Sequence, residues 1–327
     1  MKLFRTFLEI SESLHKISYH NKIMILGSCF SENIGEKLKD YKFNVCVNPF
    51  GILYNPFSIK QSLEILLRNH IFTKSDLYNY QDKWLSFYHD TEFTDENPDK
   101  CLEKINSNLL RAQEIFKGLD FLFITFGTSH VYEFIETNQI VSNCHKIPSK
   151  YFRKFLLSPE NIIAEYLNLF KKLFKNNDKL KVVFTVSPVR YLSDGFEQNQ
   201  LSKSILIYSV HKLCEKFNNN IFYFPAYEIF MDELRDYRFY ADDMIHPSGL
   251  ALKYVWERFM TVYFDKQTID LIDEIDKILK RLSHKPFKPY STEYKNFVKS
   301  TLAEIKKIEK KYPFINFSEE TRKLIEK

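Results

Sequence analysis

Apolar residues gather in five short, unbroken runs along the first two thirds of the chain. Each run has the length of a strand, and none alternates with polar residues as a half-exposed strand does. Strands buried on both faces of a parallel sheet show this continuous pattern. The pattern therefore predicts five buried strands, at residues 23–26, 43–47, 119–126, 180–186 and 221–224.

Segments with helical periodicity separate these runs. Asn97-Pro98 and Ser158-Pro159 each combine a capping side chain with a proline suited to the first helical turn. A third helix is expected after Pro247, where apolar residues are spaced to share one face. The alternation of strands and helices predicts an α/β fold in which helices cover both faces of one parallel sheet.

Two stretches depart from this alternation and indicate how the chain is divided. Residues 56–118 are long and mostly helical in pattern, which suggests an insertion that covers or shapes a substrate site. Residues 266–327 alternate lysine and glutamate at helical spacing, as solvated helices do. We therefore expect a main domain over residues 1–265 and a charged helical extension over residues 266–327.

Composition narrows the class of protein. Among the 327 residues, 44% are hydrophobic and 27% are charged, which is ordinary for a soluble globular protein. Much of the net charge of +5 comes from the alternating lysines near the C-terminus, so no nucleic-acid partner is expected. We expect no membrane association, because no apolar run approaches the roughly 18 residues of a membrane helix and the N-terminus lacks a secretion signal. Five cysteines without a C-x-x-C pair favour reduced thiols and a cytoplasmic location, and argue against a zinc site.

Polar motifs follow three of the predicted strands, at the edge where ligands bind in parallel sheets. They are Gly27-Ser28-Cys29, Gly127-Thr128-Ser129-His130 and Ser187-Pro188-Val189-Arg190. Ser28 and Cys29 offer a hydroxyl and a thiol, and Asp243 and His246 lie three residues apart in a later loop. A nucleophile, a base and a carboxylate that orients the base are the groups that acyl transfer needs.

Each of these residues also has a structural alternative. Ser28 is suited to capping the helix that follows it, and Cys29 to burial as a small apolar side chain. Asp243 could cap the helix after Pro247, and an isolated histidine such as His246 is often structural. The joint order of the motifs along the chain favours the functional interpretation.

The same motifs resemble those of a known family. Residues 22–35 contain Gly27-Ser28-Cys29-Phe30-Ser31, which is similar to the motif that names the GSCFA family and to the first block of the SGNH (GDSL-type) hydrolases. The resemblance continues through residues 48–56, 143–146 and 187–190 and the Asp243/His246 pair, and so covers roughly residues 1–265. It implies the three-layer α/β/α sandwich of those hydrolases, a flavodoxin-like arrangement with a five-stranded parallel sheet.

The resemblance also implies roles for individual residues. His246 would be the general base, Asp243 the carboxylate that orients it, and Gly51 a backbone donor to the oxyanion. The superfamily places an asparagine after a glycine in its third block, and this chain departs from that pattern. The oxyanion donor is therefore left open among three residues, Thr128, Ser129 and Asn143.

Two further residues are candidates for the rim of the site. Arg190 could hold a carboxylate or phosphate on the substrate, with a surface ion pair as the alternative. His145 could line the pocket or be a hydrogen-bonded loop residue, and His130 competes for the same space.

The alignment leaves two candidate nucleophiles. Without a gap, Cys29 takes the position of the superfamily's serine, whereas a shift by one residue gives that position to Ser28. We favour Cys29, because a helix N-terminus and a nearby histidine are expected to lower the pKa of its thiol. The implied activity is hydrolysis of an acyl ester on a carbohydrate or similar small hydroxylated substrate, without metal or cofactor. The alternatives are an acyltransferase with an acyl thioester donor and a non-catalytic carbohydrate-binding protein on the same fold.

Overall fold

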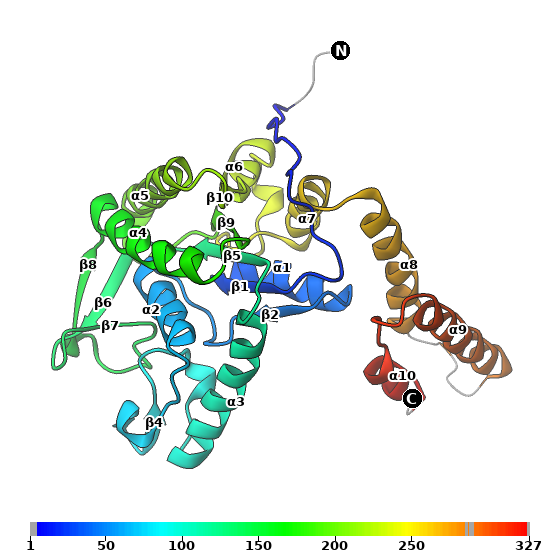
Figure 1. Cartoon of the computed structure of the whole chain (residues 1–327), viewed down its shortest axis with the longest axis horizontal. Helices are drawn as coiled ribbons and strands as arrows, with labels where there is room; N and C mark the ends of the chain where they lie inside the picture. Colours follow the sequence, from blue (N-terminus) through cyan, green and yellow to red (C-terminus); the bar gives the residue numbers. More distant parts are fainter. Residues whose placement is uncertain (1–4, 285–286, 288–290, 326–327) are drawn as a thin grey trace.

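The protein is built on one parallel sheet of five strands. The computed structural model describes residues 5–284, 287 and 291–325. The strands are β1 (Ile23–Gly27), β2 (Val45–Val47), β5 (Phe121–Phe126), β9 (Lys181–Val186) and β10 (Ile221–Tyr223). All five run parallel in the order β2-β1-β5-β9-β10 (Figure 1). The five apolar runs are thus confirmed as strands, and their ends differ from the predicted ones by at most two residues.

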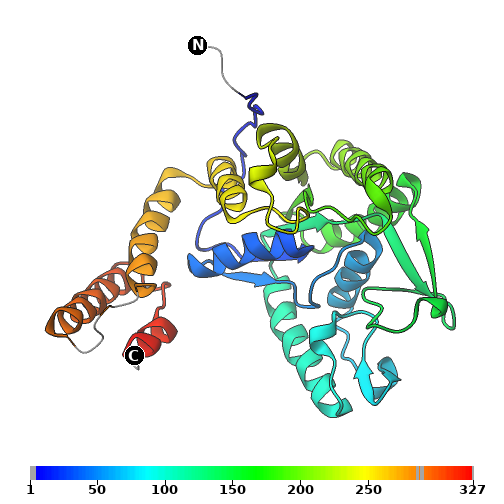
Figure 2. The same cartoon turned by 180° about the vertical axis from the view of Figure 1, so that it is seen from behind.

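Helices cover both faces of this sheet and complete a three-layer α/β/α sandwich (Figure 1 and Figure 2). Along β1, Met24 and Leu26 face one apolar core, whereas Ile23 and Ile25 face the other. The first core is shared with α2 (Pro56–Leu67), α3 (Pro98–Phe116), α4 (Pro159–Asn176) and α5 (Gly195–Lys216). The second core is shared with α1 (Cys29–Asp40), α7 (Gly249–Tyr263) and α8 (Lys266–Leu282). The predicted fold is confirmed.

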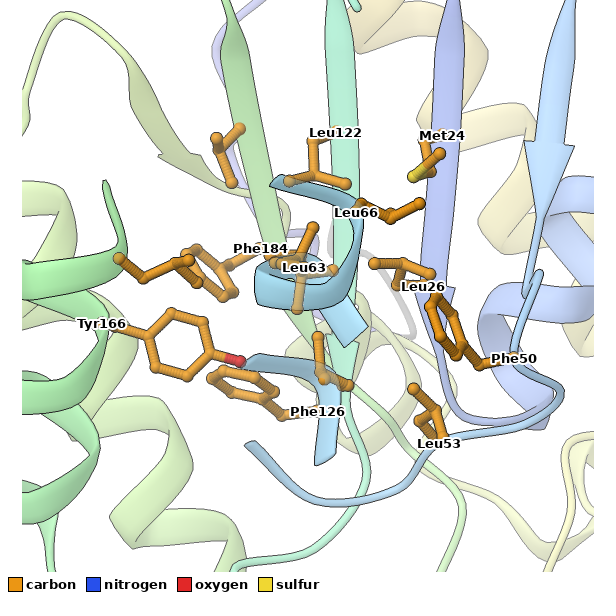
Figure 3. Packing of buried hydrophobic residues seen from close by; sticks show 14 of the residues in the cluster. Met24, Leu26, Phe50, Leu53, Leu63, Leu66, Leu122, Phe126, Tyr166 and Phe184 are labelled. Atoms are coloured by element: carbon orange, nitrogen blue, oxygen red, sulfur yellow. The ribbon is translucent and has the colours of Figure 1, made fainter. Parts of the chain in front are cut away.

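Large side chains fill the first core. Figure 3 shows Phe126 and Phe184 beside Tyr166, with Leu63 and Leu66 of α2 lying over the sheet. The ring centroids of Phe126 and Phe184 lie 5.3 and 5.9 Å from that of Tyr166. The buried hydroxyl of Tyr166 donates to the carbonyl of Pro56 at 2.8 Å, so α4 is tied to the start of α2.

The strand order places a crevice between β1 and β5. When only the strands of this sheet are counted, the order is 2-1-3-4-5, which is that of flavodoxin-like folds. The chain leaves β1 toward one edge of the sheet and leaves β5 toward the other. Ligands bind at such a point, outside the carboxyl ends of the two strands.

The segment 56–118 differs in part from the expected helical insertion. Its ends are α2 and α3, which pack against the sheet, but its middle holds a hairpin of β3 (Tyr78–Tyr80) and β4 (Lys83–Leu85). The ring centroid of Tyr78 lies 5.3 Å from those of Phe87 and Phe134, so this aromatic residue packs within the protein. The segment therefore forms part of one helical layer of the sandwich, with a hairpin between its two helices.

A second, antiparallel sheet follows β5, in a region where the sequence pattern gave no strands. It consists of β6 (His130–Phe134), β7 (Gln139–Val141) and β8 (Phe152–Leu156), in the order β7-β6-β8. Phe134, Val141 and Phe152 pack together with Leu85 and Phe87 in a small separate core. The three strands therefore form a wall beside the carboxyl end of the main sheet.

The remaining elements lie around the sandwich. Short 3-10 turns occur at Lys74–Asp76, Thr91–Phe93, Ser149–Tyr151 and Tyr237–Phe239, and α6 (Ala226–Glu228) continues into a π-helical turn at Ile229–Glu233. Figure 1 shows α8, α9 (Thr292–Lys311) and α10 (Ser318–Ile325) beside the sandwich, beyond α7. Among the helices of the described residues, none has both the length and the apolar character needed to cross a membrane.

An N-terminal arm, residues 5–21, is anchored on α7 and the π-helical turn. The N–H of Leu8 donates to Glu233 at 2.6 Å, and Arg258 donates to the carbonyl of Leu8 at 2.5 Å. Further along, the N–H of Ile17 donates to the carbonyl of Tyr263 at 2.8 Å, and the Ile17 side chain is fully buried in the second core. The arm is therefore part of the folded unit.

Gly27 holds β1 and β5 close together just before the polar motif. Its φ is 140°, and a Cβ at this position would lie 2.3 Å from the carbonyl oxygen of Thr125. We expect Gly27→Ala to lower the free energy of unfolding by more than about 3 kcal/mol, or to prevent folding, in urea titrations followed by circular dichroism. Gly118→Ala is the control, because φ there is also positive, at 89°, but a Cβ would meet no atom within 4 Å. It should cost about 1 to 2 kcal/mol; equal losses in the two variants would contradict the packing argument.

Candidate active site

A cavity of about 400 Å³ opens at the carboxyl ends of β1, β5 and β9. Ser28 and Cys29 line it after β1, Gly127 after β5, and Ser187 after β9. His246 lines the same cavity from the loop that precedes α7. The structure thus brings the two motifs, which are more than 200 residues apart in sequence, to one cavity at the expected edge of the sheet.

Ser28 and Cys29 have different surroundings. Ser28 precedes α1 as its N-cap residue, but its side chain makes no capping hydrogen bond. The residue is 1% exposed, and its Oγ has no hydrogen-bond partner among the described residues. Cys29 is the first residue of α1, partly exposed, with a free thiol. The capping alternative for the Ser28 hydroxyl is therefore wrong, and both side chains belong to the cavity.

The expectation that the Cys29 thiol has a lowered pKa is wrong. Burial raises the pKa of this thiol, and the nearby carboxylate of Glu32 raises it further. The N–H groups of Phe30 and Cys29 and the amine of Lys203 lower the pKa, but they do not outweigh burial. Cys29 is therefore a neutral thiol at pH 7 and needs a base before it can attack.

His246 and Asp243 form a hydrogen-bonded pair beside the cavity. Asp243 Oδ2 lies 2.7 Å from His246 Nδ1. Asp243 Oδ1 accepts the backbone N–H groups of Ile245 at 2.9 Å and His246 at 3.0 Å. These bonds, the one from the His246 backbone first, lower the pKa of Asp243 to about 2. Because Ser248 caps α7 instead, Asp243 is free to orient the imidazole and leave its Nε2 available for proton transfer.

Gly51 lies outside the cavity and has no free donor. Its N–H donates to the carbonyl of Asn48 at 2.8 Å, within a turn where φ of Gly51 is 79°. A Cβ there would lie 2.4 Å from that of Asp90, so the glycine is needed for packing. In this geometry the N–H of Gly51 is not available to an oxyanion.

The other three candidates for the oxyanion donor differ in what they already bind. The N–H of Thr128 donates to the carbonyl of Tyr54 at 3.0 Å, and that of Ser129 to the Ser202 hydroxyl at 2.8 Å. Asn143 lines the cavity, and its Oδ1 accepts the N–H of residue 145 at 2.8 Å. Its Nδ2 has no acceptor among the described residues, so the amide of Asn143 is the candidate with an unused donor.

His145 and Arg190 are placed differently by the fold. His145 is buried, with Nε2 3.1 Å from the carbonyl of Ser86, and does not line the cavity; it is a hydrogen-bonded loop residue. Arg190 lines the cavity, and its guanidinium lies 4.1 Å from the ring centroid of Tyr240. Within the described part of the chain it has no carboxylate partner, so the ion-pair alternative is not realised there. His130 also lines the cavity.

Lys203, on α5, is a site residue that the sequence analysis missed. It is 1% exposed, and its Nζ donates to the carbonyls of Gly127 at 2.6 Å and Ser187 at 2.7 Å. Burial lowers the pKa of Lys203 to about 7. A signal was present, because Lys203 falls on the same helical face as Leu206 and Val210, where an apolar residue is expected.

The protein is thus an α/β/α sandwich with a cavity lined by a thiol, a hydroxyl and the histidine of a histidine–aspartate pair. Nowhere in the described residues do three or more His, Cys, Asp or Glu side chains gather as a metal site would require. The chain belongs to the GSCFA family, which it matches over residues 22–259. Residues 275–327 match the C-terminal domain of GSCFA domain proteins. No curated protein matches the chain.

Proposed function

We propose that this protein is an acyl-ester hydrolase of the SGNH type. One observation carries the proposal: Cys29, Ser28 and the His246 imidazole line a single cavity, and Asp243 orients that imidazole. A nucleophile, a general base and an orienting carboxylate at the carboxyl edge of a parallel sheet suit covalent acyl transfer. The order of the motifs along the chain is that of the SGNH superfamily.

The proposed reaction has two steps. His246 Nε2 takes the proton of the Cys29 thiol, and the sulfur attacks the ester carbonyl. In this proposal the N–H groups at the start of α1 and the amide of Asn143, which lines the cavity, stabilise the oxyanion. His246 returns the proton to the alcohol that leaves. Water, deprotonated by His246, then hydrolyses the thioester and releases the acid and the thiol.

The walls of the cavity favour a hydroxylated, ring-shaped substrate. Tyr54, Tyr132 and Tyr191 line it, and aromatic rings of this kind pack against the apolar faces of sugars while their hydroxyls bind polar groups. We propose an acylated carbohydrate or similar small molecule. The free cysteines suit a reducing compartment, which favours the cytoplasm.

Arg190 favours a second candidate function, acyl transfer from a thioester donor. Its guanidinium lines the cavity without a carboxylate partner among the described residues, and such a group binds phosphate well. A donor such as acetyl-CoA carries phosphates. In that case an acceptor hydroxyl would take the place of water in the second step.

Trapping the acyl-enzyme tests the proposed function. The protein is mixed separately with p-nitrophenyl acetate and acetyl-CoA, quenched in acid within the first turnover, digested and analysed by mass spectrometry. We expect acetylation of the peptide that contains residues 28 and 29 with the ester. Acetylation by acetyl-CoA alone would favour the transferase. Acetylation by neither donor would contradict both and favour a non-catalytic binding protein; protein unfolded in urea is the control for chemical acetylation.

A further inference from the structure

A buried lysine is hydrogen-bonded to two strand ends that line the cavity of the candidate nucleophile. Lys203 belongs to α5, in the layer of the first core, and its side chain reaches the carboxyl ends of β5 and β9. Lysine side chains are almost never fully buried without a partner for their charge. Among the described residues Lys203 has no carboxylate partner, and burial lowers the pKa of its amine to about 7, so both its charged and its neutral form are present near neutral pH.

When Lys203 is protonated, one of its donors has no acceptor among the described residues. An ammonium group has three N–H donors, and two of them are taken by the carbonyls of Gly127 and Ser187. Both of these residues line the cavity that Ser28 and Cys29 also line. The Oγ of Ser28, also buried there, has no hydrogen-bond partner in the described part of the chain. Protonated Lys203 thus has an unused donor at two strand ends that line the same cavity as Ser28 and Cys29.

None of the other charged and titratable groups described around Cys29 takes the place of the Lys203 ammonium. Glu32 on α1 acts against ionisation of the thiol, and Tyr54 faces it from the loop after β2. His130, Arg190 and His246 line the cavity from its walls and rim. Lys203 and Cys29 are coupled electrostatically, because each shifts the pKa of the other toward the ion pair.

We propose that Lys203 is a positioning residue that stabilises negative charge on the sulfur of Cys29. His246 removes the proton from the thiol, and the charge left on sulfur is held next to the Lys203 ammonium. The carbonyls of Gly127 and Ser187 fix the ammonium in place. The role extends the proposed function, and it concerns the reactivity of the thiol, which can be measured without any acyl substrate.

The pH dependence of alkylation tests this role. Intact protein is treated with iodoacetamide between pH 6 and 10, and the alkylation of each cysteine is followed by peptide mass spectrometry. Cys144 is an internal reference, because it lines the same cavity and burial alone raises the pKa of its thiol to about 11. In the wild type we expect Cys29 to react at lower pH than Cys144. Wild-type Cys29 that reacts no faster than Cys144 at pH 7 would overturn the proposal.

Two substitutions of Lys203 distinguish the effect of its charge from its effect on folding. In Lys203→Met we expect alkylation of Cys29 at pH 7 to slow at least about tenfold, the effect of one pKa unit, while Cys144 is unchanged. Lys203→Gln keeps a donor for the carbonyls without the charge, and we expect the same loss if the methionine variant does not fold. A folded variant with the wild-type profile at Cys29 would overturn the role. The alkylation assay contains no acyl donor. Its result can therefore be interpreted even if the protein does not hydrolyse esters.

Discussion

Replacing Cys29 by alanine is expected to lower kcat on a short acyl ester by at least about 10,000-fold, whereas Ser28→Ala should retain activity within about tenfold. The two residues are adjacent, but they occupy different environments. The sulfur of Cys29 receives the N–H groups of Cys29 and Phe30 at the start of α1, and Lys203 lies near it. The hydroxyl of Ser28 is buried without a partner among the described residues. These donors stabilise charge on the sulfur, and nothing comparable activates the oxygen.

The measurement is hydrolysis of p-nitrophenyl acetate, with the fold of each variant checked by circular dichroism. Cys29→Ser is the matched control, because it keeps a nucleophilic atom at the same place but replaces the thiol with a poorly acidic hydroxyl. Because the pKa of the Cys29 thiol is raised, wild-type activity should increase toward alkaline pH, and this increase should be absent in Cys29→Ser. Loss of activity in Ser28→Ala with retention in Cys29→Ala would assign the attack to Ser28.

Removing the imidazole of His246 is expected to have the next largest effect, a loss of at least about 1,000-fold in kcat for His246→Ala. Asp243→Asn should reduce kcat by about 100-fold or more, because the amide would present an N–H to His246 Nδ1 and favour the wrong tautomer. The same variant keeps an oxygen acceptor for the N–H groups of Ile245 and His246, so the loop should keep its conformation. The readout is the same ester assay.

Asp242→Asn is the matched control for Asp243→Asn. Asp242 is the neighbouring exposed carboxylate, and the substitution removes the same charge from the same loop. The pKa of Asp243 is about 2, so this residue stays ionised throughout any practical assay. Loss of activity on mild acidification must then come from another group. Equal losses in the two asparagine variants would show that charge on the loop, and not orientation of the imidazole, is what matters.

The main sheet could be predicted from the sequence because its strands are buried on both faces. Residues such as Met24 and Ile25 face opposite cores, so both must be apolar, and the run stands out against its surroundings. Two helix starts could be predicted for a local reason, since Asn97 and Ser158 each accept a backbone N–H of the first turn. The third helix was expected after Pro247 from its apolar spacing, and its cap is Ser248 instead of Asp243. That Cys29 lies at the cavity lined by Gly127 and Ser187 followed from the rule that strand ends of a parallel sheet share one edge.

The remaining features depend on contacts that no local pattern encodes. The strands β6, β7 and β8 are short and mix polar with apolar residues, so they lack the continuous apolar runs that mark the main sheet. The raised pKa of Cys29 depends on how much of the thiol is removed from water, which outweighs the helix terminus. The family resemblance implied that the Gly51 N–H is a free donor, but a turn in the structure uses this N–H. Lys203 was missed although it falls on an apolar helical face, because its bonds to the carbonyls of Gly127 and Ser187 arise only when α5 packs on the strand ends.

The anchoring of the N-terminal arm has a practical consequence for any fragment of this protein. The family match begins at Lys22, yet Ile17 and Tyr19 upstream of it are buried in the second core. A fragment trimmed to the match would uncover that core and open the fully buried carboxylate of Glu233 to water. The family match therefore begins inside the folded unit, and a stable fragment must also contain the N-terminal arm.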